Sequence, residues 1–283
     1  MWSIGLVIIT LATGGSLIAQ PPAESGQGIQ ALQDAVISSI ARAEKSVVAI
    51  ARIPKDRNQR SAGILDLQRQ FLDPDQLPQS RIDPKNPDYL PGHFSSGVII
   101  DRQGHIVTTF HSLGDPKRHD YVVWIAGTAF EATRVKTPPA VLAGDPWTDL
   151  AILKIEPAGT PIELGNAESI RKGTFVVALG NPYALARDGR PSAASGIVAN
   201  LRRAAPPRVV SADRRPKDTL SHYGTLIQVD LKLPFGSSGG ALVNLKGELI
   251  GLTSSLAPLV GYESSAGFAI PVDSTFRHSL ERL

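Results

Sequence analysis

The residues around Ser238 have the composition of a loop that presents a nucleophile. From Phe235 to Leu242 the chain reads Phe-Gly-Ser-Ser-Gly-Gly-Ala-Leu, just before an apolar stretch. Acyl transfer needs room at a serine hydroxyl and a backbone that can direct two N–H groups at a developing oxyanion, and glycine permits both. Such a segment can also be only a flexible turn. Its meaning therefore depends on whether the chain supplies partners for the serine.

A histidine and an aspartate in suitable contexts lie upstream. His111 directly follows the β-rich run His105–Thr109, where the end of a buried strand can hold an imidazole. Asp149 opens the apolar run Leu150–Ile155, and a buried carboxylate there needs a partner such as an imidazole N–H. Taken singly, the histidine could be structural and the aspartate could cap a strand. With Ser238 they follow the order His, Asp, Ser, which is one of the known orders of a nucleophilic triad.

The composition excludes several other chemistries. The 283 residues include no cysteine, which rules out thiolate catalysis, cysteine-based zinc sites, iron–sulfur clusters and disulfides. With 29 Lys+Arg against 26 Asp+Glu the net charge is only +3, without the basic stripe typical of nucleic-acid binding. His105 and His111 have no third ligand nearby, and no metalloprotease, phosphate-loop or dinucleotide motif is present. We therefore expect no metal and no other cofactor.

About a dozen short β-rich segments, separated by Gly, Asn, Asp and Pro, must position these side chains. No long helical stretch separates them, which disfavours a parallel sheet. The pattern predicts an all-β fold of two packed antiparallel six-stranded barrels, over about residues 30–165 and 166–283. Amphipathic spacing predicts a short helix over residues 30–43 and another after a capping Asp273. Asn244 to Gly247 is typical of a hairpin turn.

Three segments stand outside this pattern. Residues 2–19 form an uncharged apolar run before Gln-Pro-Pro, which indicates a signal peptide or membrane anchor on an exported protein. Residues 54–92 are rich in Pro, Asp, Gln and Arg, as in a long surface insertion. Residues 202–217 carry five arginines and a lysine among prolines. That segment is either a solvated loop or an attachment point for an anionic partner.

The ordered blocks resemble the HtrA (DegP/DegQ) group of trypsin-like serine proteases. The similarity includes the segments from Gly104 to His111, from Thr148 to Ala151 and from Gly236 to Asn244, and it runs from about residue 34 to the C-terminus. It implies a serine endopeptidase of the bacterial periplasm or cell envelope that cleaves unfolded or misfolded polypeptides. The nucleophile, the base and the orienting carboxylate would be Ser238, His111 and Asp149.

The resemblance also implies an oxyanion hole formed by the backbone N–H groups of Gly236 and Ser238. The strand that follows the nucleophile would pair with the substrate backbone by β-augmentation. Its predicted substrate-binding residues are Thr253, Ser254 and Ser255. Leu233 would line an apolar specificity pocket, because no acidic residue lies in the segment 231–237.

Relatives of this group continue into a PDZ domain and often form homotrimers. The corresponding expectations here are no PDZ domain after Leu283, polypeptide substrates as partners, and a homotrimer. Residues 2–19 would provide any attachment to a membrane.

Two departures from the family pattern keep another function open. Phe110 stands before the histidine where a small or polar residue is common, and Pro234-Phe235 replaces Asn-Pro before the glycine. A loop displaced by Phe235 would leave a catalytically silent protein with a protease fold. Such a protein would bind unfolded polypeptides or envelope components without cutting them.

Overall fold

The computed structural model describes residues 23–55, 93–134, 136–137, 141–142, 144–145, 148–182, 188–203, 225–255 and 266–282. Residues 1–34 and 35–283 are separate units, and the barrels lie in the second unit. The predicted signal or anchor segment falls outside the described residues, as do residues 56–92 of the predicted insertion and residues 204–217 of the basic segment. Within the described part of the chain, no helix has the length and apolarity needed to cross a bilayer.

The first barrel is a closed ring of six antiparallel strands, in the order β3-β2-β1-β4-β5-β9 with β9 pairing back to β3, and β8 is added beside β9. The bounds are β1 Val47–Pro54, β2 His93–Ile99, β3 His105–Thr109, β4 His119–Ile125, β5 Thr128–Arg134, β8 Gly144–Asp145 and β9 Leu150–Lys154. A separate small sheet pairs β6 (Lys136–Thr137) with β7 (Val141–Leu142). The helical turn α3 (Phe110–Leu113) follows β3 directly.

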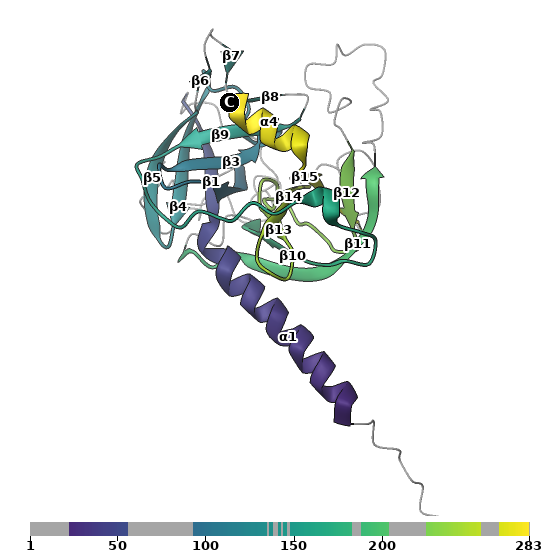
Figure 1. Cartoon of the computed structure of the whole chain (residues 1–283). Coiled ribbons are helices and arrows are strands. Elements are labelled where there is room, and N and C mark those ends of the chain that lie inside the picture. Colours follow the sequence, from purple (N-terminus) through teal and green to yellow (C-terminus); the bar gives the residue numbers. More distant parts are fainter. Residues whose placement is uncertain are drawn as a thin grey trace, which may run out of the picture. The chain divides into compact units, whose positions relative to one another are not determined.

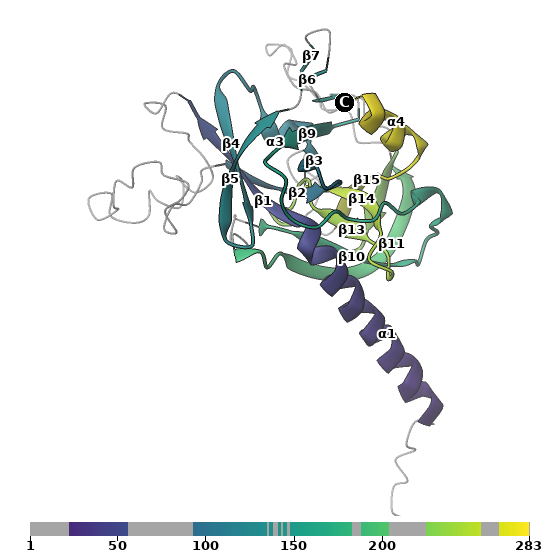
Figure 2. The same ribbon diagram turned by 60° about the vertical axis from the view of Figure 1, so that its left-hand side comes forward.

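The second barrel closes in the order β10-β11-β12-β15-β14-β13. Its strands are β10 Phe175–Gly180, β11 Ser192–Arg203, β12 Leu226–Val229, β13 Ala241–Val243, β14 Leu249–Ser254 and β15 Gly267–Pro271. The remaining elements are α1 (Ala23–Ala43), the 3₁₀ turns η1 (Glu44–Ser46) and η2 (Ala167–Ser169), and α4 (Ser274–Arg282). The prediction of two six-stranded antiparallel barrels is confirmed, and Figures 1 and 2 show them side by side.

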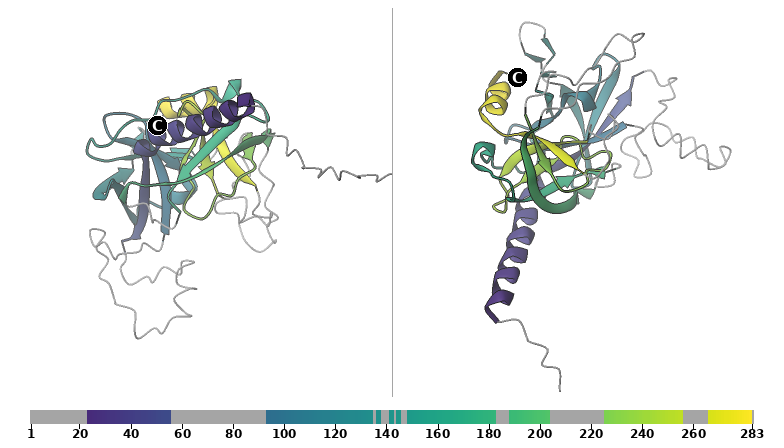
Figure 3. Two further views of the ribbon diagram at one scale, coloured as in Figure 1. Left: turned by 90° about the horizontal axis from the view of Figure 1, so that it is seen from below. Right: turned by 90° about the vertical axis from the view of Figure 1, so that its right-hand side faces the viewer.

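Strands buried on both faces explain the continuous apolar runs in the sequence. Successive residues of a strand point to opposite faces. In β1, Val48 belongs to the core inside the first barrel, whereas Val47 joins a central cluster built from both barrels. In β10, Val176 lies in the core of the second barrel and Val177 in the central cluster. The central cluster joins the two barrels into one body. Figure 3 shows the ribbon of the chain from two further directions.

Several elements differ from the sequence-based expectation. Helix α1 begins at Ala23 and has 21 residues, so it is neither short nor limited to residues 30–43. Its added turns carry no apolar stripe, and burial periodicity cannot detect such turns. Strand β5 was not predicted because Phe130 is its only large apolar residue. Strand β7 pairs with β6 in the small sheet and lies outside the barrels.

Asp273 caps α4 as the sequence indicated. Its Oδ1 accepts a hydrogen bond from the N–H of Phe276 at 2.9 Å, and Phe276 is buried in the central cluster. Loss of an N-cap acceptor usually costs about 1 kcal/mol. We therefore expect Asp273→Ala to lower the free energy of unfolding by about 1 kcal/mol in urea titrations, and Asp273→Asn, which keeps an acceptor, to lower it by only a few tenths. Equal losses in both variants would contradict this role for the side-chain oxygen.

Candidate active site

The fold brings Asp149 next to the turn that carries His111. Strands β3 and β9 pair antiparallel with Thr109 opposite Leu150, so the residues just beyond this pair face each other. The N–H of Phe110 donates to the backbone carbonyl of Asp149 at 2.7 Å, and the N–H of His111 donates to Asp149 Oδ1 at 2.9 Å. Asp149 thus fixes the start of α3 through two backbone N–H groups, in addition to the contact between its carboxylate and the imidazole.

The carboxylate of Asp149 also fixes the tautomer of His111. Asp149 Oδ2 lies 2.7 Å from His111 Nδ1, and the aspartate side chain is fully buried. Because a carboxylate only accepts hydrogen bonds, Nδ1 carries the proton and Nε2 keeps a free lone pair. Asp149 has a φ of +59°, which non-glycine residues rarely adopt. Such a backbone costs of order 1–3 kcal/mol and persists here because three hydrogen bonds hold the residue.

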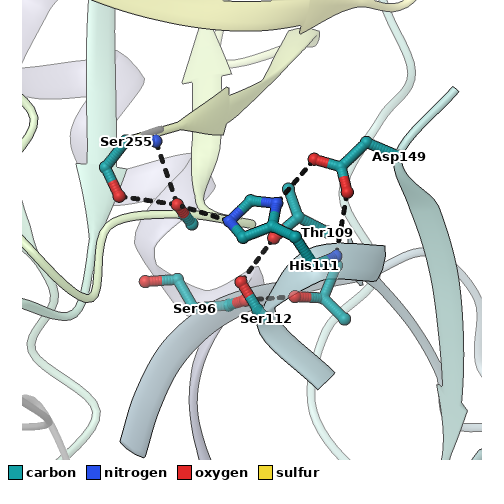
Figure 4. A network of polar contacts seen from close by, with 8 residues as sticks. Ser96, Thr109, His111, Ser112, Asp149 and Ser255 are labelled. Carbon is teal, nitrogen blue, oxygen red and sulfur yellow. Dashed lines mark hydrogen bonds and ion pairs between the residues drawn. The ribbon is translucent and has the colours of Figure 1, made fainter. Parts of the chain in front are cut away.

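His111 Nε2 lies 3.3 Å from Ser238 Oγ. Asp149, His111 and Ser238 therefore form one continuous line of polar contacts across the two barrels. The histidine and aspartate come from the first barrel and the serine from the loop before β13 of the second. In Figure 4 the His111 ring lies with Asp149 on one side and Ser255 on the other.

Ser255 also contacts the hydroxyl of Ser238, which sequence reasoning did not foresee. Its N–H donates to Ser238 Oγ at 2.9 Å, and the two hydroxyl oxygens are 2.6 Å apart. A hydroxyl has one proton and two lone pairs, and the Ser255 N–H occupies one of those lone pairs. In this arrangement Ser238 can give its proton either to His111 Nε2 or to Ser255 Oγ.

A tight turn precedes Ser238. The N–H of Ser237 donates to the carbonyl of Pro234 at 3.1 Å, and Gly236 has a φ of +93°. A Cβ at Gly236 would lie 2.6 Å from a ring carbon of Phe94, so both backbone and space require glycine. Within the described residues, the N–H groups of Gly236 and Ser238 donate to no protein acceptor. They are the two donors that the family resemblance implies for the oxyanion hole.

A family model for the trypsin-like peptidase domain matches residues 95–252, which include all three residues of this line of contacts. The chain belongs to the trypsin-like peptidase family. The periplasmic serine endoprotease DegP of Salmonella typhimurium is 36% identical over 179 residues, covering 62% of this chain and 33% of that protein. A probable periplasmic DegP-like endoprotease of Pseudomonas putida is 29% identical over 259 residues, covering 88% of this chain and 49% of that protein.

A solved structure of the serine endoprotease from Yersinia pestis has the same fold, with a TM-score of 0.56 at 23% identity. The match covers 87% of this chain and 65% of that one. The trypsin-like peptidase chain described here spans half or less of the length of these curated relatives. The resemblance to the HtrA (DegP) group agrees with these matches.

The other predicted site residues of this trypsin-like peptidase have different surroundings. Thr253 is buried. Its N–H donates to the carbonyl of Gly240, its carbonyl accepts from the N–H of Gly239, and its Oγ1 donates to the carbonyl of Ser237 at 2.5 Å. We therefore assign Thr253 to support of the nucleophile loop. Ser254 ends β14 and is also buried. Leu233 is half-buried and packs against the core of the second barrel.

One partly buried cationic side chain contacts the turn that carries His111. Arg52 of β1 donates to the carbonyl of Ser112 at 3.4 Å, directly after His111, and burial lowers the pKa of its guanidinium below the usual value. Within the described ranges, no three His, Asp or Glu side chains gather in a group that could hold a metal ion.

Proposed function

We propose that the chain is a serine endopeptidase that cleaves unfolded or misfolded polypeptides by acyl transfer. The observation that carries the proposal is the continuous line of contacts from the buried Asp149 through His111 to Ser238. Family membership supports the reaction class. The activity itself is tested by labelling the full chain with a fluorophosphonate, which reacts only with an activated serine, and by cleavage of denatured casein.

In this mechanism Ser238 Oγ attacks the scissile carbonyl carbon while its proton passes to His111 Nε2. The imidazolium is stabilised by Asp149, which keeps Nδ1–H in place. As the tetrahedral intermediate collapses, the C–N bond breaks and the leaving amine takes the proton from Nε2. A water molecule then attacks the acyl group, gives its proton to His111 and regenerates Ser238.

The negative charge that develops on the carbonyl oxygen needs two donors in place. The N–H groups of Gly236 and Ser238 fill this role in the proposal, and each such donor is typically worth about 3 kcal/mol in the transition state. The substrate backbone would pair along Ser254 and Ser255, as predicted from the sequence. Its approach would displace Ser255 from the hydroxyl of Ser238.

The same proposal assigns the protein to the bacterial periplasm or cell envelope. It rests on the apolar run at residues 2–19 and on the periplasmic names of the DegP relatives. The homotrimer and membrane association stay predictions. Size-exclusion chromatography with light scattering tests the first, and fractionation of cells expressing the full chain tests the second.

A catalytically silent binding protein is the alternative function, and Phe235 distinguishes the two. Its side chain is 37% exposed, whereas Phe110 packs against the core of the first barrel. Substitution of an exposed side chain usually changes the free energy of unfolding by less than about 0.5 kcal/mol. A change of that size in an activation free energy would alter a rate about twofold. We therefore expect Phe235→Ala to label with fluorophosphonate within about threefold of the wild-type rate. An increase of tenfold or more would mean that Phe235 holds the site closed.

A further inference from the structure

Ser96 of β2 has every polar group engaged, and two of its bonds go to the nucleophile loop. Its N–H donates to the carbonyl of Ser238 at 2.8 Å, and its Oγ donates to the carbonyl of Gly236 at 2.7 Å. The same Oγ accepts from the N–H of Asn181 at 2.7 Å, and the carbonyl of Ser96 accepts from Thr108 Oγ1 at 2.7 Å. The residue is completely buried.

These bonds connect one barrel to the catalytic loop of the other. Ser96 and Thr108 belong to the first barrel, whereas Gly236 and Ser238 belong to the second and Asn181 directly follows β10. Ser96 therefore fixes the position of the loop relative to the barrel that carries His111. A fully buried hydroxyl needs partners of this kind, because an unpaired hydroxyl in the protein interior is costly.

Three consecutive carbonyls of the loop are held in this way. Ser96 Oγ holds that of Gly236, Thr253 Oγ1 and the Gly240 N–H hold that of Ser237, and the Ser96 N–H holds that of Ser238. A trans peptide directs its C=O and the next N–H to opposite sides. Holding the carbonyl of Ser237 on one side therefore presents the N–H of Ser238 on the other.

The bond from Ser96 Oγ has the corresponding effect on Gly236. It fixes the plane of the peptide between Gly236 and Ser237, whose N–H closes the turn onto the carbonyl of Pro234. With that plane fixed, the Cα of Gly236 is held in place, and the φ of +93° at this residue sets the direction of its own N–H relative to the fixed plane. If this bond were absent, the Cα that carries the first oxyanion donor would lose one of its supports.

We propose that Ser96 is a positioning residue that keeps the N–H groups of Gly236 and Ser238 aligned as the oxyanion hole. The inference rests on the proposed serine-peptidase function. Ser96 touches no reacting atom in this role. It acts through the carbonyls that it holds, and its hydroxyl is the group whose removal separates positioning from simple packing.

The test compares Ser96→Ala with Ser95→Ala in the full chain. Ser95 is the preceding residue of β2, is also buried, and takes no part in the bonds described above. Removal of an oxyanion-hole donor lowers kcat about 10²–10³-fold. A donor that is present but misaligned should lower kcat by a smaller factor. We expect Ser96→Ala to lower kcat for casein-derived peptides and the rate of fluorophosphonate labelling about 10- to 100-fold, with KM within about twofold.

The pH profile separates this role from an indirect effect on the base. Because Ser96 does not contact His111 or Asp149, the acid limb of the labelling rate should have the same midpoint in Ser96→Ala, Ser95→Ala and the wild type. Ser96→Thr keeps a hydroxyl and should recover a large part of the lost rate. Circular dichroism and the melting temperature establish that each variant is folded.

The outcomes are distinct. A Ser96→Ala variant that labels as fast as Ser95→Ala, or whose loss appears in KM or in a shifted pH midpoint, overturns the proposal. Equal losses in the two serine variants, accompanied by equal destabilisation, also overturn it, because packing alone would then account for the effect. A wild-type chain that neither labels nor cleaves overturns the proposed function, and this inference with it.

Discussion

Ser238→Ala is expected to abolish cleavage of casein and labelling by fluorophosphonates while leaving the melting temperature close to that of the wild type. Among the residues that the structure describes, the Ser238 side chain makes polar contacts only with His111 and Ser255, so we expect the fold not to depend on its hydroxyl. Loss of the nucleophile from a triad typically reduces kcat about a millionfold. Casein cleavage by the purified full chain, measured at fixed times, and fluorophosphonate labelling, measured on gels, report the two losses independently.

Ser95→Ala serves as the matched control, since it removes the same atom from another buried serine. Wild-type rates of casein cleavage in Ser238→Ala would contradict the assignment of this residue as nucleophile. If labelling survived in Ser238→Ala and disappeared in Ser237→Ala, the neighbouring serine would be the nucleophile instead.

Asp149→Asn is expected to reduce kcat and the labelling rate by about 10⁴-fold. The carboxylate now accepts from both the backbone N–H and Nδ1–H of His111. An amide has only one acceptor oxygen. If that oxygen keeps the backbone N–H, the amide NH₂ faces Nδ1 and favours the tautomer with its proton on Nε2. That tautomer cannot take the proton of Ser238.

A second Asp–His pair on the same molecule provides the control. Asp101 Oδ2 lies 2.6 Å from His105 Nδ1, on a partly exposed surface and outside the line of contacts that leads to Ser238. Asp101→Asn should therefore label at the wild-type rate. A fall of less than about tenfold in Asp149→Asn, in a variant that remains folded, would mean that the carboxylate does not set the tautomer of the base.

The sequence predicted the barrels because apolar runs report burial. Strands β3 and β9 were recognised from their β-rich segments, and their pairing places His111 beside Asp149 without further information. The turn α3 was not predicted, since four residues are too few for a helical period to emerge. The φ of +59° at Asp149 was also not foreseeable, because only tertiary hydrogen bonds hold it there.

The supporting residues of the site were invisible for a different reason. Ser96 and Thr253 stand in buried strands, where a single serine or threonine has no distinctive sequence pattern. Their partners Gly236 and Ser237 are far away in the sequence or lie across a hairpin, so no local spacing links them. Ser255 was predicted to bind substrate because of its strand, and only coordinates reveal its contact with the nucleophile.

The central cluster between the barrels sets how they pack against each other. The proposed activity therefore depends on this packing as well as on the folding of each barrel. Val47 and Leu150 of one barrel and Val243 and Leu252 of the other meet there. A chain with two intact barrels that are docked slightly out of register would contain every residue of the triad and still lack the 3.3 Å contact between His111 and Ser238. The rate of the proposed reaction is therefore expected to respond more strongly to the packing between the two barrels than the free energy of unfolding does.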